Sequence, residues 1–102
     1  MSEPTPLFET QRLGEVKPYT YDFTNFLRSG ATISSVAGSY AQTYSPAGSA
    51  LASGSCASAL SAGSVTIISP ALVDTGQYAF AATATMNNGD VRSQVWFVTV
   101  NR

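Results

Sequence analysis

The stretch Leu72-Val73-Asp74-Thr75-Gly76-Gln77-Tyr78-Ala79-Phe80 decides the fold of this chain. It passes from a polar turn directly into a segment where apolar residues recur at every second position, the period of a half-buried strand. One strand earlier lies Val65-Thr66-Ile67-Ile68, a β-branched run that predicts a strand of its own. A terminal hairpin follows. The succession of strands places the chain in the all-β class.

The hairpin is the clearest element of the sequence. Residues 78–86 and 91–100 read as two strands joined by residues 87–90, Asn-Asn-Gly-Asp. Asn88 and Gly89 favour a tight turn because Asn and Gly tolerate positive φ.

Two registers are open for this hairpin. A two-residue turn pairs Phe80 with Phe97. A three-residue turn, with the glycine in a bulge, pairs Phe80 with Trp96 and Tyr78 with Val98. We favour the second register, since it puts the largest side chain, Trp96, into the core beside the two aromatic residues.

Three segments upstream complete the β pattern. Residues 19–24 alternate aromatic and polar side chains, and residues 25–30 then form a turn that has room for one helical turn. A second strand is expected over residues 31–41, where the alternation slips between Ile33 and Val36 and indicates a bulge. Residues 47–64, almost entirely Ala, Ser and Gly, have the composition of a flexible linker. We favour a strand there, because Ala52, Cys56, Ser58 and Leu60 share one parity.

Residues 1–17 read as an extended arm, and residues 18–102 as the folded domain. Prolines punctuate the arm, and no helical or strand period runs through it. Two supports for such an arm remain open, a neighbouring chain or the chain's own domain, and we favour the neighbour. Docking contacts are expected from Leu7, Phe8 and Leu13.

The last strand also predicts a binding surface. Val95, Trp96, Phe97 and Val98 make it apolar on both faces, whereas an antiparallel sheet in water normally keeps one wet face. Because Trp96 is assigned to the core, Val95 and Phe97 lie on the opposite face. We expect a partner to cover them.

Composition excludes several classes of function. The 102 residues fit one domain, and the net charge is only −1 with 11% charged residues. No basic stripe is present to neutralise phosphates, so no nucleic-acid partner is expected. No apolar run approaches the roughly 20 residues of a membrane span. So little charge is more natural for a subunit held in an assembly than for a freely diffusing protein.

The sequence also argues against catalysis. It contains no histidine, which removes Ser-His-Asp triads, Cys-His pairs and the usual zinc sites together. Its six carboxylates are scattered, so neither a catalytic pair nor a calcium site is expected. Cys56 stands alone and can form no intrachain disulfide. We expect no enzyme activity, no cofactor and no metal.

The turn at Asp74 resembles the corner found in immunoglobulin-type domains, where an Asp-x-Gly-x-Tyr motif lets the tyrosine hydroxyl bond back to nearby backbone. In this resemblance Phe80 occupies the place of the second bridging cysteine of antibody domains. The fold expected is therefore an immunoglobulin-like antiparallel β-sandwich of about seven strands with an extended N-terminal arm. The residues given structural roles are Asp74, Gly76, Tyr78, Phe80, Asn88, Gly89 and Trp96.

A wider resemblance covers about residues 19–100. The opening Tyr19-Thr20-Tyr21-Asp22-Phe23, the strand Thr32-Ile33-Ser34-Ser35-Val36, Gly76-Gln77-Tyr78 and the Asn88-Gly89 hairpin resemble a family of small virion proteins of tailed bacteriophages. Its members are described as fiber-tail adaptor or immunoglobulin-like virion proteins. The Ala/Ser-rich middle and the long arm depart from the usual form, which leaves the location in the virion open.

The resemblance implies a structural adaptor that links tail or neck to fiber, assembled in the host cytoplasm, with other virion proteins as partners and as a homo-oligomer. A capsid decoration protein is the related alternative, which copy number would distinguish. An alternative from another class is a carbohydrate- or cell-surface-binding module, for which Tyr40 and Tyr44 are the candidate sugar-stacking residues.

Overall fold

The structure is a computed structural model that describes residues 5–27 and 29–102. It contains seven strands and one short 3₁₀ helix among these residues. The elements are β1 (Leu7–Arg12), β2 (Pro18–Asp22), η1 (Thr24–Phe26), β3 (Ile33–Tyr44), β4 (Ser53–Ser61), β5 (Ser64–Ile68), β6 (Gly76–Met86) and β7 (Val91–Asn101). The expected all-β class and strand number are confirmed.

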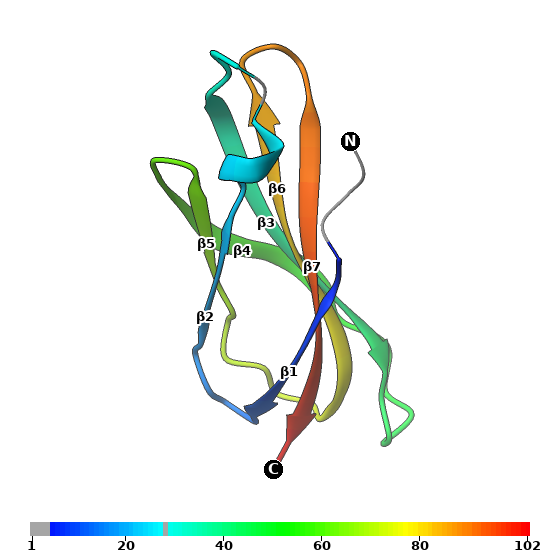
Figure 1. The fold of residues 1–102 in the computed structure, drawn as a ribbon. Coiled ribbons are helices and arrows are strands. Elements are labelled where there is room, and N and C mark those ends of the chain that lie inside the picture. The colour runs from blue at the N-terminus through cyan, green and yellow to red at the C-terminus, as the bar shows by residue number, and fades with distance from the viewer. Residues whose placement is uncertain (1–4, 28) are drawn as a thin grey trace.

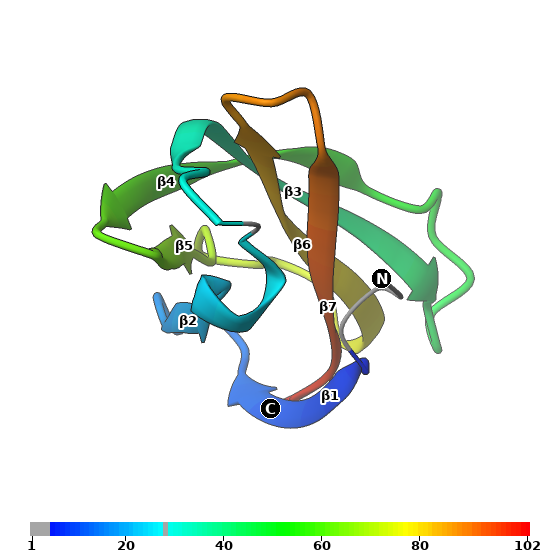
Figure 2. The same cartoon turned by 45° about the horizontal axis from the view of Figure 1, so that its top comes forward.

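The seven strands belong to one mixed sheet in the order β1-β7-β6-β3-β4-β5-β2. Figures 1 and 2 show that this sheet curls into a half-barrel, with β2 and β5 opposite β6 and β7. Every pair within residues 18–102 is antiparallel, as the sequence predicted. The one parallel pair joins β1 to β7.

Strand β4 carries the chain around the curl, because it changes partner halfway along. Residues 53–56 pair with β3, and residues 57–61 pair with β5. Small residues permit this close approach: a Cβ on Gly38 would lie 2.8 Å from the side chain of Ile67. The Ala/Ser/Gly-rich segment is thus a strand, as favoured, although Cys56 is its one buried residue.

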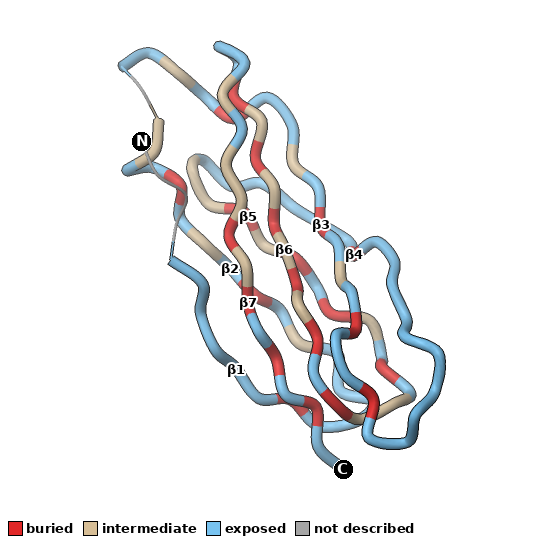
Figure 3. The backbone as a smooth tube through the Cα atoms, turned by 90° about the vertical axis from the view of Figure 1, so that its right-hand side faces the viewer, coloured by how far each residue is buried: buried red, intermediate tan, exposed pale blue. Residues whose placement is uncertain are grey.

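The core fills the space enclosed by the curl. Tyr19 of β2 reaches across it, and the ring centroids of Phe80 and Trp96 each lie 5.6 Å from that of Tyr19. Figure 3 shows buried and less buried positions alternating along β6 and β7. The apolar period read from the sequence therefore matches the face that each strand turns inward.

The hairpin register is the three-residue one. Tyr78 pairs with Val98 and Phe80 with Trp96. The N–H of Gly89 donates to the carbonyl of Met86 at 3.0 Å, and Gly89 has φ of 93°. This conformation suits glycine, as the bulge prediction required.

Further upstream, the register of β3 shifts between Ile33 and Ser35, where the bulge was expected. The helical turn expected within residues 25–30 is the 3₁₀ helix η1, which begins one residue earlier. Position 28 of that turn lies outside the described residues. Strand β2 ends at Asp22, two residues short of the predicted end.

The N-terminal segment differs from the expectation of an arm without strand character. Residues 7–12 form β1, which pairs with β7 along its whole length (Figure 1). The arm therefore contains a strand, although no strand period was found in its sequence. Its residues are mostly exposed, with one buried exception, so the apolar period that marks other strands is missing here. Of the two supports left open, the chain's own sheet holds this part of the arm.

Candidate partner-binding surface

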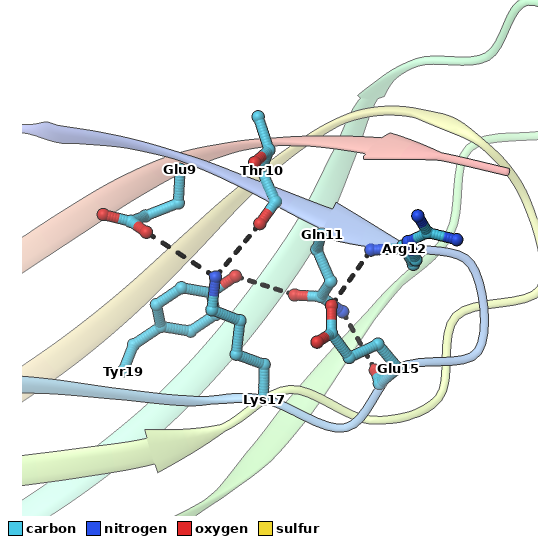
Figure 4. A network of polar contacts seen from close by, with 7 residues as sticks. All are labelled: Glu9, Thr10, Gln11, Arg12, Glu15, Lys17 and Tyr19. Atoms are coloured by element: carbon cyan, nitrogen blue, oxygen red, sulfur yellow. Dashed lines mark hydrogen bonds and ion pairs between the residues drawn. The ribbon is translucent and has the colours of Figure 1, made fainter.

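Side-chain hydrogen bonds tie β1 to β2 across the open side of the half-barrel. Gln11 is 3% exposed, and its Oε1 accepts a hydrogen bond of 2.7 Å from the Tyr19 hydroxyl (Figure 4). Its Nε2 donates to Ser69 Oγ at 2.8 Å and to the Glu15 carbonyl at 3.0 Å. The buried amide is thus paired at both ends, as a buried polar group requires.

Two charged side chains, those of Lys17 and Glu15, bind backbone groups at the free edge of β1. Lys17 Nζ donates to the Thr10 carbonyl at 3.1 Å and lies 3.7 Å from Glu9 Oε1, and the Arg12 N–H donates to Glu15 Oε1 at 3.0 Å (Figure 4). Charges of this kind block pairing with another chain's strand. Burial, with Glu9 and Glu15 nearby, raises the pKa of Tyr19 to about 12.

The corner at Asp74 is a second polar cluster. The Tyr78 hydroxyl donates to the Asp74 carbonyl at 2.8 Å, the backbone bond that the resemblance implied. The Asp74 carboxylate accepts hydrogen bonds from Ser45 Oγ at 2.6 Å and Gln42 Nε2 at 2.9 Å. These two bonds, that from Ser45 foremost, lower the pKa of Asp74.

The other residues with predicted structural roles lie in turns or in the core. Gly76 has φ of 124°, and a Cβ there would lie 2.0 Å from the Tyr44 carbonyl oxygen, so this position requires glycine. Phe80 and Trp96 are buried in the core. Asn88, in the hairpin turn at the other end of β6, accepts a hydrogen bond from the Asp90 N–H at 3.0 Å.

On the outside of the sheet, one row of paired residues crosses five strands. Register gives the order Phe8, Phe97, Ala79, Ala41, Ser53 on β1, β7, β6, β3 and β4. Paired residues share a face, and this face points away from the core that holds Phe80 and Trp96. We call it the outer face.

Two rings stand together at one side of this face. Phe8 is 78% exposed, Phe97 is 41% exposed, and their centroids lie 5.6 Å apart. Val95 precedes them on the same face of β7 and is half-buried. We call Phe8, Phe97 and Val95 the aromatic ridge. Residues far apart in the sequence thus form one apolar surface.

The structure brings together three of the five residues predicted to bind partners. Leu7 pairs with Trp96 and so points to the opposite side of β1 from Phe8. Leu13 lies beyond the end of β1, where its N–H donates to the Asn101 carbonyl at 2.7 Å. Both are exposed, but neither belongs to the ridge.

The outer face is almost free of charge. Along the described strands β1, β7, β6, β3 and β4, the residues that alternate outward are Phe, Val, Ala, Ser, Thr, Gln and Asn, with Arg12 at one end as the charged exception. Beside the ridge lies an open hollow of about 470 Å³, lined in part by Phe8, Thr43, Gln77 and Phe97. A face of this kind suits an uncharged protein surface rather than an ionic ligand.

The two tyrosines considered for sugar binding do not form a platform. Tyr40 faces inward and stacks on Phe80 with centroids 5.8 Å apart, while Tyr44, past a register shift, is 57% exposed. Among the described residues no group of three or more His, Cys, Asp and Glu side chains lies close enough to hold a metal ion. No helix in residues 5–27 and 29–102 has the length and hydropathy to cross a membrane.

Sequence reasoning missed the buried glutamines. Gln11 and Gln42 are 3% and 4% exposed, and each joins segments distant in sequence. Gln94 is also buried, and its Nε2 donates to the Thr5 carbonyl at 3.0 Å. A weak signal existed for Gln94, since it shares the inward parity of Trp96 and Val98.

Comparisons with known proteins support the fold alone. No protein-family model matches this chain, and no curated protein matches it. A crystal structure of Listeria monocytogenes InlP matches with a TM-score of 0.56 and 23% sequence identity, over 94% of this chain. The match covers 26% of the InlP chain, so the chain spans about a quarter of that protein's length. A domain of this shape is therefore also found within a longer protein.

Proposed function

We propose that this chain is a non-enzymatic structural protein of the virion of a tailed bacteriophage, an adaptor between tail or neck and fiber. Its half-barrel would be an immunoglobulin-type β-sandwich domain. The Tyr78–Asp74 bond and the packing of Tyr19 against Phe80 and Trp96 support this finer fold assignment.

The observation that carries a binding role is the aromatic ridge. A ring that is 78% exposed, tilted against a second exposed ring and set in a face with almost no charge, supports a role in binding another protein. The virion setting is supported separately by the resemblance of residues 19–100 to phage virion proteins. In either role, adaptor or capsid decoration protein, the chain would bind its neighbour through this face.

Particles of the phage that encodes this chain provide the test. Quantitative mass spectrometry of purified virions should find the chain in a ring-like number of about 6–12 copies for a tail adaptor, against hundreds for a capsid protein. Electron microscopy then locates it. Absence of the chain from washed particles would refute the virion role.

A matched pair of variants connects the ridge to assembly. Phe8→Ser removes the more exposed ring and should lower incorporation into particles, because its partner loses an apolar contact. Val73→Ser changes a residue that is 93% exposed on the loop between β5 and β6, outside the strands of the outer face, and should leave incorporation unchanged. Equal incorporation of both variants would separate the ridge from assembly.

A further inference from the structure

The outer face is graded in side-chain size from one side to the other. Its central row runs from Phe8 and Phe97 to Ala79, Ala41 and Ser53. The adjacent row repeats this order, with Val95 followed by Ala81, Ser39 and Ser55. The face thus has the aromatic ridge over β1 and β7 and a region of small residues over β6, β3 and β4. We call the second region the small-residue floor.

We propose that the outer face binds a second copy of this chain, face to face, about a two-fold axis that runs along β6. Such an axis exchanges the two sides of the sheet, so the ridge of each copy lies on the floor of the other. The inference rests on the proposed binding role of the ridge and names its partner.

Register fixes which residues meet across the axis. Phe97 of one copy lies over Ala41 of the other, and Phe8 lies over Ser53, because each pair is equally distant from β6. Ala79 meets its own counterpart at the axis. Large side chains therefore pack on small ones at both ends, which lets two sheets approach to the ~10 Å spacing of packed sheets.

The lack of charge favours this occupant. A protein surface that carried many charges would have to desolvate them against a face that offers Arg12, at its end, as its charged residue among those described. A second outer face brings no such cost, since its own residues are uncharged across both rows. The surface therefore matches itself in polarity as well as in shape.

The extent of the outer face can be compared with that of known interfaces. Five strands about 4.8 Å apart span about 20 Å, and a strand of the length of β7 spans about 35 Å. The face offers at most roughly 700 Å² per copy, because β1 and the part of β4 that pairs with β3 are shorter than β7, and this lies at the low end of the ~600–1,000 Å² per partner of standard interfaces.

Sedimentation equilibrium of the purified chain tests the inference directly. The wild-type chain should show a reversible monomer–dimer equilibrium. Ala79→Arg places two cations against each other at the axis and should weaken dimerisation about a hundredfold or more. Val73→Arg is the matched control, because it adds the same charge at a residue that is 93% exposed elsewhere, and it should dimerise like the wild type.

A mixing experiment tests the predicted contacts. Phe97→Lys and Ala41→Glu should each be monomeric, since each homodimer would bury unpaired charges. Mixed in equal amounts they should form a heterodimer, because the lysine of one chain then meets the glutamate of the other. Circular dichroism and thermal melting establish that both variants are folded.

Two results would overturn the inference. One is a wild-type chain that stays monomeric to millimolar concentration. The other is a dimer that Ala79→Arg leaves intact, which would show that copies associate through another face. If a variant fails to fold, the monomer–dimer equilibrium of the wild-type chain still tests the inference. These experiments use the isolated chain, so their failure is distinguishable from absence of the chain in virions, which refutes the proposed function.

Discussion

The hydroxyl of Tyr78 and the backbone carbonyl of Asp74 are joined by a hydrogen bond of 2.8 Å that closes the corner before β6. Tyr78 is 1% exposed, so its ring is core while its hydroxyl fixes the turn. The carboxylate of the same aspartate accepts hydrogen bonds from Gln42, which lies in β3, and from Ser45, which follows β3. One residue thus joins the turn to the neighbouring strand.

Tyr78→Phe keeps the ring and removes this hydroxyl. We expect a loss of about 1–1.5 kcal/mol in the free energy of unfolding, the net value of a hydrogen bond in a folded protein. Urea denaturation measures it. Tyr44→Phe removes an exposed hydroxyl from a ring that is 57% exposed and should change stability little. If both substitutions lowered the free energy of unfolding equally, the Tyr78–Asp74 hydrogen bond would not stabilise the corner specifically.

Trp96→Ala should destabilise the fold by about 3–5 kcal/mol, because it leaves a cavity in the core. Trp96 is 2% exposed and packs against Tyr19. Phe97→Ala, one residue along the strand, should cost clearly less, since that ring is 41% exposed. Thermal or chemical denaturation compares the two. The opposite order of stabilities would mean that the hairpin register is shifted by one residue.

Gly89→Val tests the hairpin turn. Nothing lies within 4 Å of a Cβ placed on Gly89, so the expected destabilisation comes from the positive φ rather than from a clash. Gly89→Asn is the matched variant, because asparagine tolerates this conformation better than a β-branched residue. We expect the valine variant to melt at the lower temperature. Identical melting temperatures would contradict the backbone assignment at this position.

Much of this fold could be predicted because several of its strands carry a clear sequence pattern. In β6 and β7 the apolar period of two, the Asn88-Gly89 signal and the size of Trp96 specify strand, turn and register together. Strand β1 has no such pattern. Its residues are exposed on both faces apart from Gln11, so hydrogen bonding along β7 holds it, and periodicity cannot detect that.

The aromatic ridge, too, could be predicted from the sequence only in part. Phe97 was identifiable because a strand apolar on both faces must turn one face outward. Its contact with Phe8 depends on a parallel pairing between the two ends of the chain, and no local signal encodes a pairing of that range. The buried glutamines are similar, since Gln11 finds Ser69 across 58 positions.

High pH should destabilise the fold through Tyr19. Its pKa is about 12 in the folded chain against an ordinary 10.0, so below pH 10 both states keep the proton and the contribution is complete. Between pH 10 and about 12 the unfolded chain loses its proton first, and the free energy of unfolding falls. Tyr19→Phe should reduce this slope. Denaturation curves across this range measure it, and an unchanged slope would refute the assignment.

Deleting residues 1–12 tests whether β1 belongs to the fold. The deletion removes Gln11, the partner of the Tyr19 hydroxyl and of Ser69, and uncovers the edge of β7 beside Trp96. We expect a folded but less stable chain, because these buried hydrogen bonds contribute about 1 kcal/mol each. Phe8→Ser leaves β1 in place and changes a ring that is 78% exposed, so it should cost much less. If the deletion matches the stability of the full chain in urea denaturation, β1 is a dispensable arm after all.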